Sequence, residues 1–411
     1  MRRVIDGQRL CLSEERQKRA QREEAESKQI AVRTPESGTN AHHLCRSAGN
    51  GNFHKHLESI RRHPFYMKLP SPTGVIIKRG LLPSFHGAVV ASAGEGRILK
   101  QPPEYVGVYG ERARGREDVV VIMGATGTGK SKLSIDIAGR FPAEVVNADK
   151  IQVYRGLDIT TNKMPMIERR GVPHHLLGDF DPDLGELQPE EFRSLAEEAV
   201  AGITSRGRIP VVAGGSNSYI HAMMVDEYDP GENPFVEKPA SKQGSLQYRS
   251  CLIWVDVEAA TLAEHLDRRV DEMLGAGMVE ELERYFDGEK EAEKRHPGLG
   301  KAIGVPEFRE YFRRRRTAAG YEEAVAAIKE NTRRLSGEQV RKIRRLEEIG
   351  WPLIRVDATE AVEAKLAARG RVAVEAAWEQ NVLGPSLRAV ERFSDNSSAR
   401  RRLLPASKYC C

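Results

Sequence analysis

The chain has 411 residues, of which 40% are hydrophobic and 30% charged, and its formal net charge is +5. A chain of this length and apolar content can bury a sizeable core, which excludes bulk disorder and any need for stabilising disulfides or metals. No run of about 18 apolar residues occurs, so the sequence predicts no membrane-spanning helix. The five cysteines are scattered without metal-ligand spacing, which favours a reducing compartment. The isoelectric point near 8.8 suits phosphate-bearing ligands or nucleic acid, and equally a solvated basic surface.

The first 116 residues differ in composition from the rest of the chain. Residues 14–28 are a mixed-charge stretch without an apolar stripe, and residues 33–115 are rich in Gly, Pro, Ser, His and basic residues. We therefore predict that residues 1–116 are a largely disordered extension. Acidic residues are sparse from Met67 to Gly115, as in organelle transit segments, and this predicts a plastid location with the cytoplasm as the alternative. Translation from Met67, an artefact of gene prediction and an ordinary extension all stay open.

From Asp118 onward, short apolar runs alternate with helical patterns. The runs that suit buried parallel strands are residues 119–123, 143–147, 209–213, 252–257 and 353–356. Helical spacing covers residues 132–140, 189–205, 260–274, 279–286 and about 321–349, and a further helix follows Gly214-Gly215. This alternation predicts an α/β fold, with a P-loop NTPase-like parallel sheet flanked by helices.

The same patterns divide the chain into four parts. Residues 1–116 are the extension, and residues 117–257 are the P-loop α/β core. Residues 258–357 are predicted to form a mainly helical, substrate-covering subdomain that returns one late strand to the core. Residues 358–411 are predicted to be a helical or disordered tail.

The first strand and helix flank a phosphate-binding motif. It matches G-x4-G-K-[ST] and consists of Gly124, Ala125, Thr126, Gly127, Thr128, Gly129, Lys130 and Ser131. A position directly after a strand and before a helix is the context in which this motif binds phosphate. Its glycines let backbone N–H groups turn toward an anion, and Lys130 adds a positive charge. Ser131 can hold a Mg²⁺ ion that bridges the phosphate oxygens.

Polar residues follow two further strands. Asp149 comes after the second strand, where a carboxylate can accept a proton from a nucleophile, hold a metal or cap a helix. The third strand ends in Gly214-Gly215, which permits close approach of a flat ligand, and Ser216 and Asn217 then offer hydrogen bonds. Loop capping is the alternative role for these two side chains. No apolar strand ends in a lone aspartate of the Walker-B kind, which argues against NTP-driven phosphoryl transfer.

Several longer motifs together resemble the isopentenyltransferase family. They are GATGTGKSKLS, NADKIQVYRGLDITTNK, ERRGVPHHLLG, VVAGGSNSYIHA, YRSCLIWVDV, RRVDEMLGAGMVEEL, KAIGVPEF and IKENTRRLSGEQVRKIRRL. The resemblance covers about residues 118–357. Of the two branches of that family, the chain is similar to the plant adenylate isopentenyltransferases of cytokinin biosynthesis. The tRNA-modifying branch has different signatures where this chain has ADKIQ and GVPEF.

The resemblance implies a reaction. A dimethylallyl group would pass from dimethylallyl diphosphate to the N6 amine of adenine in ADP or ATP, and more weakly in AMP. The P-loop would hold the donor diphosphate, with Thr126 at the oxygen between carbon and phosphorus and Mg²⁺ on Ser131. Asp149 would accept the N6 proton, and Ser216 and Asn217 would fix the acceptor. The expected partners are these two substrates, without membrane or tRNA, and a monomer is expected.

Further residues complete or qualify this picture. Lys329 and Arg333 are spaced i, i+4 on one helix face and are candidates for the diphosphate site, with a solvated basic face as the alternative. No metal is expected at His174-His175. Two positions depart from the family pattern: Gly300 stands where an arginine is usual, and Gly337 costs about 1 kcal/mol relative to alanine in a helix interior.

Three other functions stay open. A small-molecule kinase or NTPase would use the same P-loop without any prenyl donor. A tRNA-prenylating enzyme often carries an RNA-gripping insertion and a C-terminal zinc finger, whereas only about 25 residues precede the fourth strand here and Cys410-Cys411 lacks a histidine pair. A degenerate binding protein is the third.

Overall fold

The computed structural model describes residues 117–236, 245–288 and 296–403. The predicted disordered extension, residues 1–116, lies outside the described residues, as does the end of the predicted tail. Among the described helices, none combines the length and the apolar character that crossing a membrane would require.

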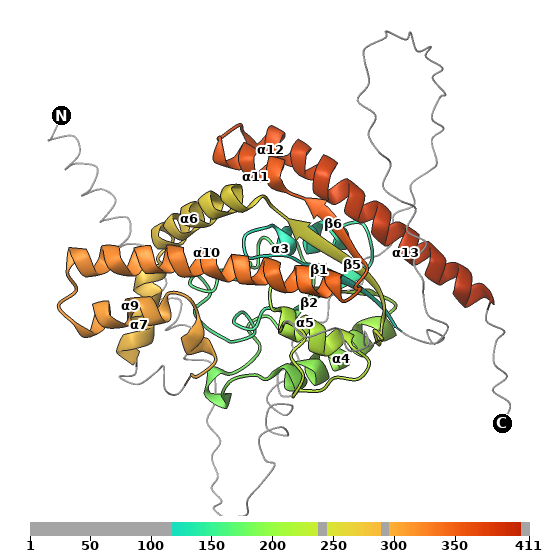
Figure 1. The fold of residues 1–411 in the computed structure, drawn as a ribbon, viewed down its shortest axis with the longest axis horizontal. Coiled ribbons are helices and arrows are strands. Elements are labelled where there is room, and N and C mark those ends of the chain that lie inside the picture. The colour runs from blue at the N-terminus through green and yellow to red at the C-terminus, as the bar shows by residue number, and fades with distance from the viewer. Residues whose placement is uncertain (1–116, 237–244, 289–295, 404–411) are drawn as a thin grey trace, which may run out of the picture. The chain divides into compact units, whose positions relative to one another are not determined.

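Six parallel strands form one sheet, in the order β3-β2-β4-β1-β5-β6 (Figure 1). Their bounds are β1 (Asp118–Met123), β2 (Ala143–Asn147), β3 (His174–His175), β4 (Ile209–Gly214), β5 (Arg249–Asp256) and β6 (Leu353–Asp357). The predicted α/β fold with a parallel sheet flanked by helices is confirmed. The short edge strand β3 was not predicted, because two histidines carry no strand pattern.

Helices connect the strands and continue after the last one. They are α3 (Lys130–Ala138), α4 (Pro189–Ser205), α5 (Asn217–Met224), α6 (Ala259–Gly275), α7 (Met278–Gly288), α9 (Val305–Arg313), α10 (Ala318–Glu348), α11 (Thr359–Leu366), α12 (Arg371–Trp378) and α13 (Gly384–Leu403). Two 3₁₀ turns, Pro182–Leu184 and Leu299–Lys301, and a π-helical turn, η3 (Glu379–Leu383), complete the described elements.

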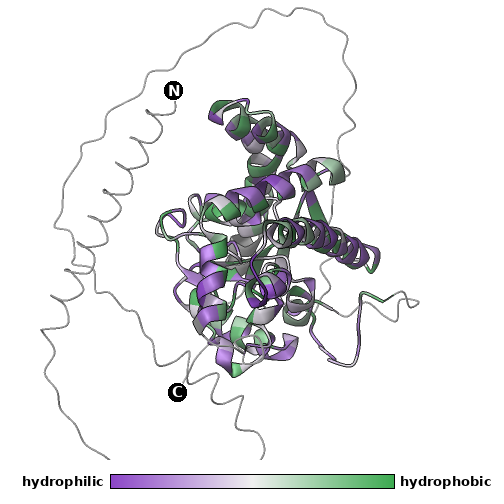
Figure 2. Cartoon of the chain, turned by 90° about the vertical axis from the view of Figure 1, so that its left-hand side faces the viewer, coloured by the Kyte–Doolittle hydropathy of each residue, from purple (hydrophilic) through white to green (hydrophobic). Residues whose placement is uncertain are grey.

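The sheet separates two apolar cores, because successive residues of a strand point to opposite faces. Val119, Val121 and Met123 of β1 face the core that α4, α5 and α10 cover. Val120 and Ile122 face the core shared by α3 and the C-terminal helices. Figure 1 shows α11 and α12 on the side of the sheet away from α4 and α5. The helices mix hydrophilic and hydrophobic residues along their length (Figure 2), as expected of helices that cover a sheet with one face.

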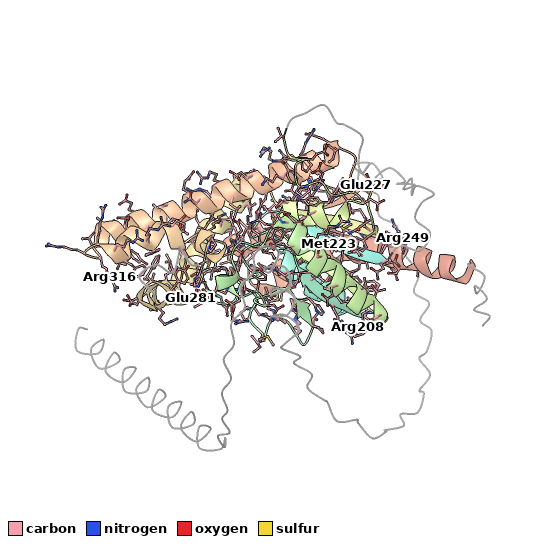
Figure 3. All side chains as sticks on the ribbon, turned by 90° about the horizontal axis from the view of Figure 1, so that it is seen from below. Arg208, Met223, Glu227, Arg249, Glu281 and Arg316 are labelled. Carbon is pink, nitrogen blue, oxygen red and sulfur yellow. The ribbon has the colours of Figure 1, made fainter. Side chains whose placement is uncertain are left out.

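Ion pairs and hydrogen bonds at the periphery hold these layers together. Arg249, at the start of β5 (Figure 3), donates to Asp118 Oδ1 at 2.5 Å and to the Phe393 carbonyl of α13 at 2.9 Å. Glu281 of α7, also labelled in Figure 3, accepts hydrogen bonds from Ile159 N and Thr160 N. The helical region after β5 is thus tied to the segment after β2, and α13 to the sheet.

Candidate active site

The P-loop lies at the carboxyl end of β1 and leads directly into α3. Gly127 has a φ of 85° and Gly129 a φ of 93°, a left-handed conformation that glycine adopts without the strain other residues suffer. Within the loop, Thr128 Oγ1 donates to the Ala125 carbonyl at 3.0 Å. Gly124 has no room for a side chain, because a Cβ would lie 2.5 Å from the Val255 carbonyl oxygen of β5. The predicted motif therefore forms a closed turn between the carboxyl end of β1 and the start of α3.

Lys130 folds back over this turn. Its Nζ donates to the Ala125 carbonyl at 2.7 Å. Burial lowers the pKa of Lys130 to about 8; the nearby Asp149 carboxylate opposes that shift and the Arg269 guanidinium adds to it. A desolvated ammonium group of this kind gains most from an anionic ligand that restores its lost solvation.

Arg269 of α6 is a site residue that the sequence analysis did not single out. Its Nη2 donates to Thr126 Oγ1 at 2.9 Å, and its Nε is buried without a hydrogen-bond partner among the described residues. Burial lowers the pKa of Arg269 to about 10, against the opposing effect of Asp149. A guanidinium with an unused buried N–H beside a phosphate loop is poised to donate to an anion there.

Gln339 of α10 joins the P-loop to the loop after β4. Its Oε1 accepts from Thr126 N at 2.8 Å, and its Nε2 donates to the Gly215 carbonyl at 3.0 Å. A Cβ on Gly215 would lie 2.4 Å from that Nε2, so any larger residue there would displace the Gln339 amide. Gln339 belongs to the IKENTRRLSGEQ motif, and its position in that motif was the only sequence signal for this role.

Asp149 lies after β2 on the same edge of the sheet. Its Oδ1 accepts from the backbone N–H groups of Ile151 at 3.0 Å and Gln152 at 3.3 Å. One carboxylate oxygen therefore caps a turn, as the capping alternative predicts. The carboxylate acts electrostatically on both Lys130 and Arg269, so it lies near the cationic part of the site.

Ser216 and Asn217 have structural contacts in this structure. Ser216 Oγ accepts from Lys150 N at 2.8 Å, which fastens the loop after β4 to the residue following Asp149. Asn217 is buried and its Nδ2 donates to the Gln339 carbonyl at 3.0 Å, while its Oδ1 is buried without a partner among the described residues. Both thus shape the predicted acceptor loop, and their contact with an acceptor stays a prediction.

Lys329 and Arg333 face α6. Lys329 Nζ pairs with Asp271 at 2.7 Å, and Arg333 Nη1 with Asp267 at 2.6 Å. Carboxylates therefore already engage both cationic groups, and no described hydrogen bond or ion pair joins either one to the P-loop. Their role toward diphosphate stays a prediction, and Arg269 is the arginine that the structure brings to the loop.

The two adjacent histidines are hydrogen-bonded within the protein. His174 Nδ1 lies 2.8 Å from the Val172 carbonyl, and His175 Nε2 lies 2.7 Å from Glu144 Oε2. Burial lowers the pKa of His174, which favours the neutral form of its ring. These contacts hold the short edge strand β3 in place.

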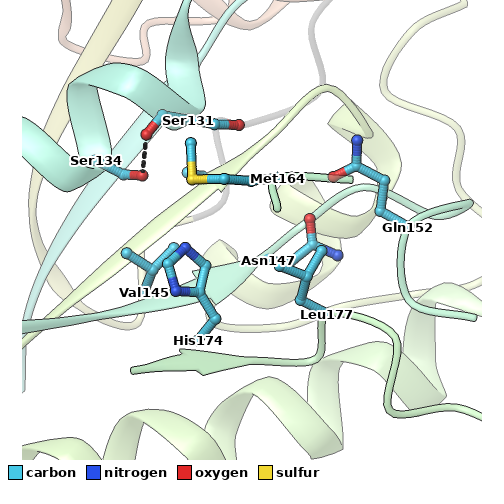
Figure 4. Close-up of a pocket in the computed structure, with 9 residues that line it drawn as sticks. Ser131, Ser134, Val145, Asn147, Gln152, Met164, His174 and Leu177 are labelled. Carbon is cyan, nitrogen blue, oxygen red and sulfur yellow. Dashed lines mark hydrogen bonds between the residues drawn. The ribbon is translucent and has the colours of Figure 1, made fainter. Parts of the chain in front are cut away.

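A small pocket opens between the first turn of α3 and the strands β2 and β3 (Figure 4). Its lining residues are Ser131, Ser134, Val145, Asn147, Gln152, Met164, His174, Leu177 and Ala213. The Ser131 side chain is exposed beside this pocket at the start of α3. Mg²⁺ prefers oxygen ligands and keeps several waters when it binds phosphates. The exposed Ser131 hydroxyl is an oxygen ligand that fits such an ion.

Known proteins share long stretches of this sequence. The family model described as IPP transferase matches residues 152–243 and 228–346. Adenylate isopentenyltransferase 1, chloroplastic, of Arabidopsis thaliana is 47% identical over 294 residues, covering 68% of this chain and 82% of that protein. The adenylate isopentenyltransferase of Humulus lupulus is 49% identical, covering 67% of this chain and 89% of that protein.

The chain belongs to the IPP transferase family. The resemblance inferred from the motifs is thereby confirmed. Other relatives carry the names adenylate isopentenyltransferase 8, chloroplastic, and adenylate isopentenyltransferase 7, mitochondrial, both from Arabidopsis thaliana, at 46% and 40% identity.

Solved structures share the fold of this IPP transferase. A eukaryotic dimethylallyltransferase described as acting on tRNA superposes with a TM-score of 0.57 at 24% identity, covering 68% of this chain and 80% of that one. The full-length tRNA isopentenylpyrophosphate transferase of Bacillus halodurans gives a TM-score of 0.50 at 25% identity, covering 67% and 99%. These similarities support the six-stranded architecture.

Proposed function

We propose that this IPP transferase moves a dimethylallyl group from dimethylallyl diphosphate to the N6 amine of adenine in a free nucleotide, the first step of isopentenyladenine-type cytokinin synthesis. One observation carries the proposal: two partly buried cations, Lys130 and Arg269, lie at the phosphate loop, and the Asp149 carboxylate is near enough to act on both. The cations suit a diphosphate leaving group, and the carboxylate suits a proton acceptor for the attacking amine. The names of the relatives support the same reaction class.

The loop residues act on the leaving group. As the bond between the allylic carbon and the diphosphate oxygen breaks, negative charge grows on the diphosphate. Lys130, Arg269 and the N–H groups at the start of α3 stabilise that charge. Ser131 would hold a Mg²⁺ ion, which supplies further neutralisation of the leaving group.

Thr126 has a specific part in this arrangement. A hydroxyl group has one proton to donate and two lone pairs to accept with. Because Arg269 donates to Thr126 Oγ1, the hydroxyl proton of Thr126 is left to donate elsewhere. It would reach the bridging oxygen of the donor, where charge develops first. Arg269 thus orients the Thr126 hydroxyl so that it can donate to the leaving group.

Asp149 acts on the acceptor. The N6 lone pair is delocalised into adenine and makes a weak nucleophile. As the N6–carbon bond forms and the carbon–oxygen bond breaks, the extra proton on N6 passes to the carboxylate of Asp149, and diphosphate departs with the bonding electron pair. General-base assistance of this kind contributes about 10²–10⁴-fold. The cap on Oδ1 holds the carboxylate in place while the other oxygen faces the acceptor.

We expect ADP and ATP to be better acceptors than AMP, and all three to be better than tRNA. The decisive experiment incubates the purified protein with dimethylallyl diphosphate, Mg²⁺ and one acceptor at a time: AMP, ADP, ATP or an anticodon stem-loop. Mass spectrometry of the products should show N6-prenylated ADP and ATP. Prenylated stem-loop as the main product would assign the chain to the tRNA-modifying branch.

A parallel incubation separates the kinase alternative. ATP and Mg²⁺ without a prenyl donor should yield no more ADP or phosphate than a blank. Rapid NTP hydrolysis under those conditions would contradict the proposed use of the P-loop.

We propose a plastid location, because several relatives are named chloroplastic. A fusion of the full chain to a fluorescent protein should colocalise with chlorophyll or another plastid marker. Diffuse cytoplasmic fluorescence would favour the alternative.

A further inference from the structure

The C-terminal helices reach the phosphate loop through one aromatic residue, Trp378. It is the last residue of α12, is 5% exposed, and lies outside the segment whose motifs resemble the family. A Cβ placed on Gly129 would lie 2.7 Å from Cη2 and 2.8 Å from Cζ3 of its indole. The indole edge therefore rests against the loop glycine where α3 begins.

Polar contacts fix the orientation of this indole. Trp378 Nε1 donates to Asp136 Oδ2 of α3 at 2.9 Å. Lys132 Nζ, one turn earlier, lies 4.7 Å from the ring centroid and pairs with Asp136 at 2.8 Å and with Glu375 of α12 at 3.2 Å. Arg170 also pairs with Asp136, at 3.3 Å. Face, edge and N–H of the indole thus all meet the first two turns of α3.

The rest of the C-terminal segment anchors Trp378 from behind. Val382 and Leu383 of the following π-helical turn are buried in the same core as Leu133 of α3, and Val390 of α13 is fully buried there. Trp378 is therefore backed by the sheet's own core where it meets Gly129, the left-handed residue that begins α3. The first N–H groups of such a helix are where an anion binds.

We propose that Trp378 is a positioning residue for the donor diphosphate. Its indole holds Gly129 and the first turn of α3 in the conformation that receives the phosphate groups. This inference rests on the proposed function of the P-loop. Without the indole, Gly129 is free to leave its conformation, and the amides at the start of α3 lose their common direction.

The test uses the full chain and two readouts. Binding of inorganic pyrophosphate with Mg²⁺ is measured by calorimetry, and KM is measured separately for dimethylallyl diphosphate and for ADP. Trp378→Ala should weaken pyrophosphate binding and raise the donor KM, each by about tenfold, because small displacements of a preorganised site cost that much or more. The KM for ADP should change by less than about twofold, since only the donor loop is displaced.

Two further variants separate positioning from stability. Trp378→Phe keeps a flat ring against Gly129 but lacks the N–H, and should recover most of the donor affinity. Val390→Ala, in the same core but away from the loop, should lower the melting temperature while leaving the donor KM unchanged. If Trp378→Ala does not fold, Trp378→Leu takes its place with the same expected split between donor and acceptor.

The outcomes are distinct. A wild-type chain that neither binds pyrophosphate nor transfers the prenyl group would overturn the proposed function and this inference with it. If the wild-type chain does both, unchanged donor KM and pyrophosphate affinity in Trp378→Ala would overturn the positioning role alone. An equal rise of donor KM in Val390→Ala would also overturn it, because general destabilisation would then explain the effect.

Discussion

Asp149 has a cap role that the structure shows and a base role that we propose. Its Oδ1 caps the turn at Ile151 and Gln152, and its charge acts on Lys130 nearby. Asp149→Asn preserves an acceptor oxygen for the cap but removes the charge and the basicity. We expect turnover to fall by about 10²–10⁴-fold, while pyrophosphate affinity changes little.

Steady-state kinetics and calorimetry check this prediction together. Asp149→Ala is the companion variant: it loses the cap as well, so it should lower the melting temperature where Asp149→Asn does not. Near-normal turnover in Asp149→Asn, or loss of pyrophosphate binding alone, would mean that the carboxylate serves as a metal ligand or a cap.

The lowered pKa of Lys130 predicts that donor binding depends on pH. Its pKa is lowered to about 8 from the ordinary 10.5, because the folded protein buries the ammonium group. Below pH 8 the lysine is charged and the diphosphate binds well. As the pH rises through 8 the lysine loses its proton, so the donor KM should rise.

Lys130→Arg provides the control, since an arginine keeps its charge over this range. The rise in donor KM above pH 8 should be absent in this variant, even if its KM is higher throughout. An identical alkaline rise in both proteins would assign the titration to another group. The unliganded protein should also gain stability from about pH 8 to 10.5, since the unfolded state binds more protons there.

At the scale of elements, hydrophobic patterns were good guides to buried segments. Each of the five apolar runs is a strand, and the long pattern from residue 321 is part of α10. The edge strand β3 was not predicted because two histidines carry no strand pattern, and a contact between strands, His175 with Glu144 of β2, helps to hold it. Helix spacing placed Lys329 and Arg333 on one face but could not name the acidic residues of α6 opposite them. A periodic pattern shows which residues share a helix face, but only tertiary packing shows which residues that face contacts.

Gly337 is a clean test of helix propensity within α10. It is exposed in the helix interior, and no atom lies within 4 Å of where its Cβ would be. Gly337→Ala should therefore stabilise the protein by about 1 kcal/mol, because alanine loses less backbone entropy and has room here. Thermal unfolding should show a higher melting temperature with unchanged kinetics. A lower melting temperature would mean that α10 bends or unwinds at this glycine.

At the scale of the whole molecule, the site is assembled from segments far apart in sequence. The P-loop receives Arg269 from α6, Gln339 from α10 and Trp378 from α12. Sequence motifs found the loop and Asp149, because these follow strands at a shared edge of the sheet. They could not find the partners, because nothing local in α6, α10 or α12 says which neighbour each side chain meets. The resemblance placed Arg269 and Gln339 inside motifs without giving them roles.

The extension before β1 should be dispensable for catalysis. Its sequence lacks the periodicity of core elements, and the described site draws all its contacts from residues after Glu117. A chain starting at Arg116 keeps the Glu117 carbonyl that accepts from Arg249 N at 3.1 Å. Its turnover should stay within about threefold of the full chain, since a preorganised site depends on its rigid supporting elements. A truncated protein that folds, as judged by circular dichroism, yet lacks activity would assign the extension a catalytic role.

We propose that this P-loop serves prenyl transfer to a free adenine nucleotide. A competition assay tests it most directly: ADP and an anticodon stem-loop at equal concentration, limiting dimethylallyl diphosphate, Mg²⁺, and quantification of both products by mass spectrometry. We expect nearly all the prenyl group on ADP, and we expect Asp149→Asn to form that product about 10²–10⁴-fold more slowly. Prenyl groups mainly on the stem-loop, or no prenylated product while ATP is hydrolysed in a parallel reaction, would contradict it.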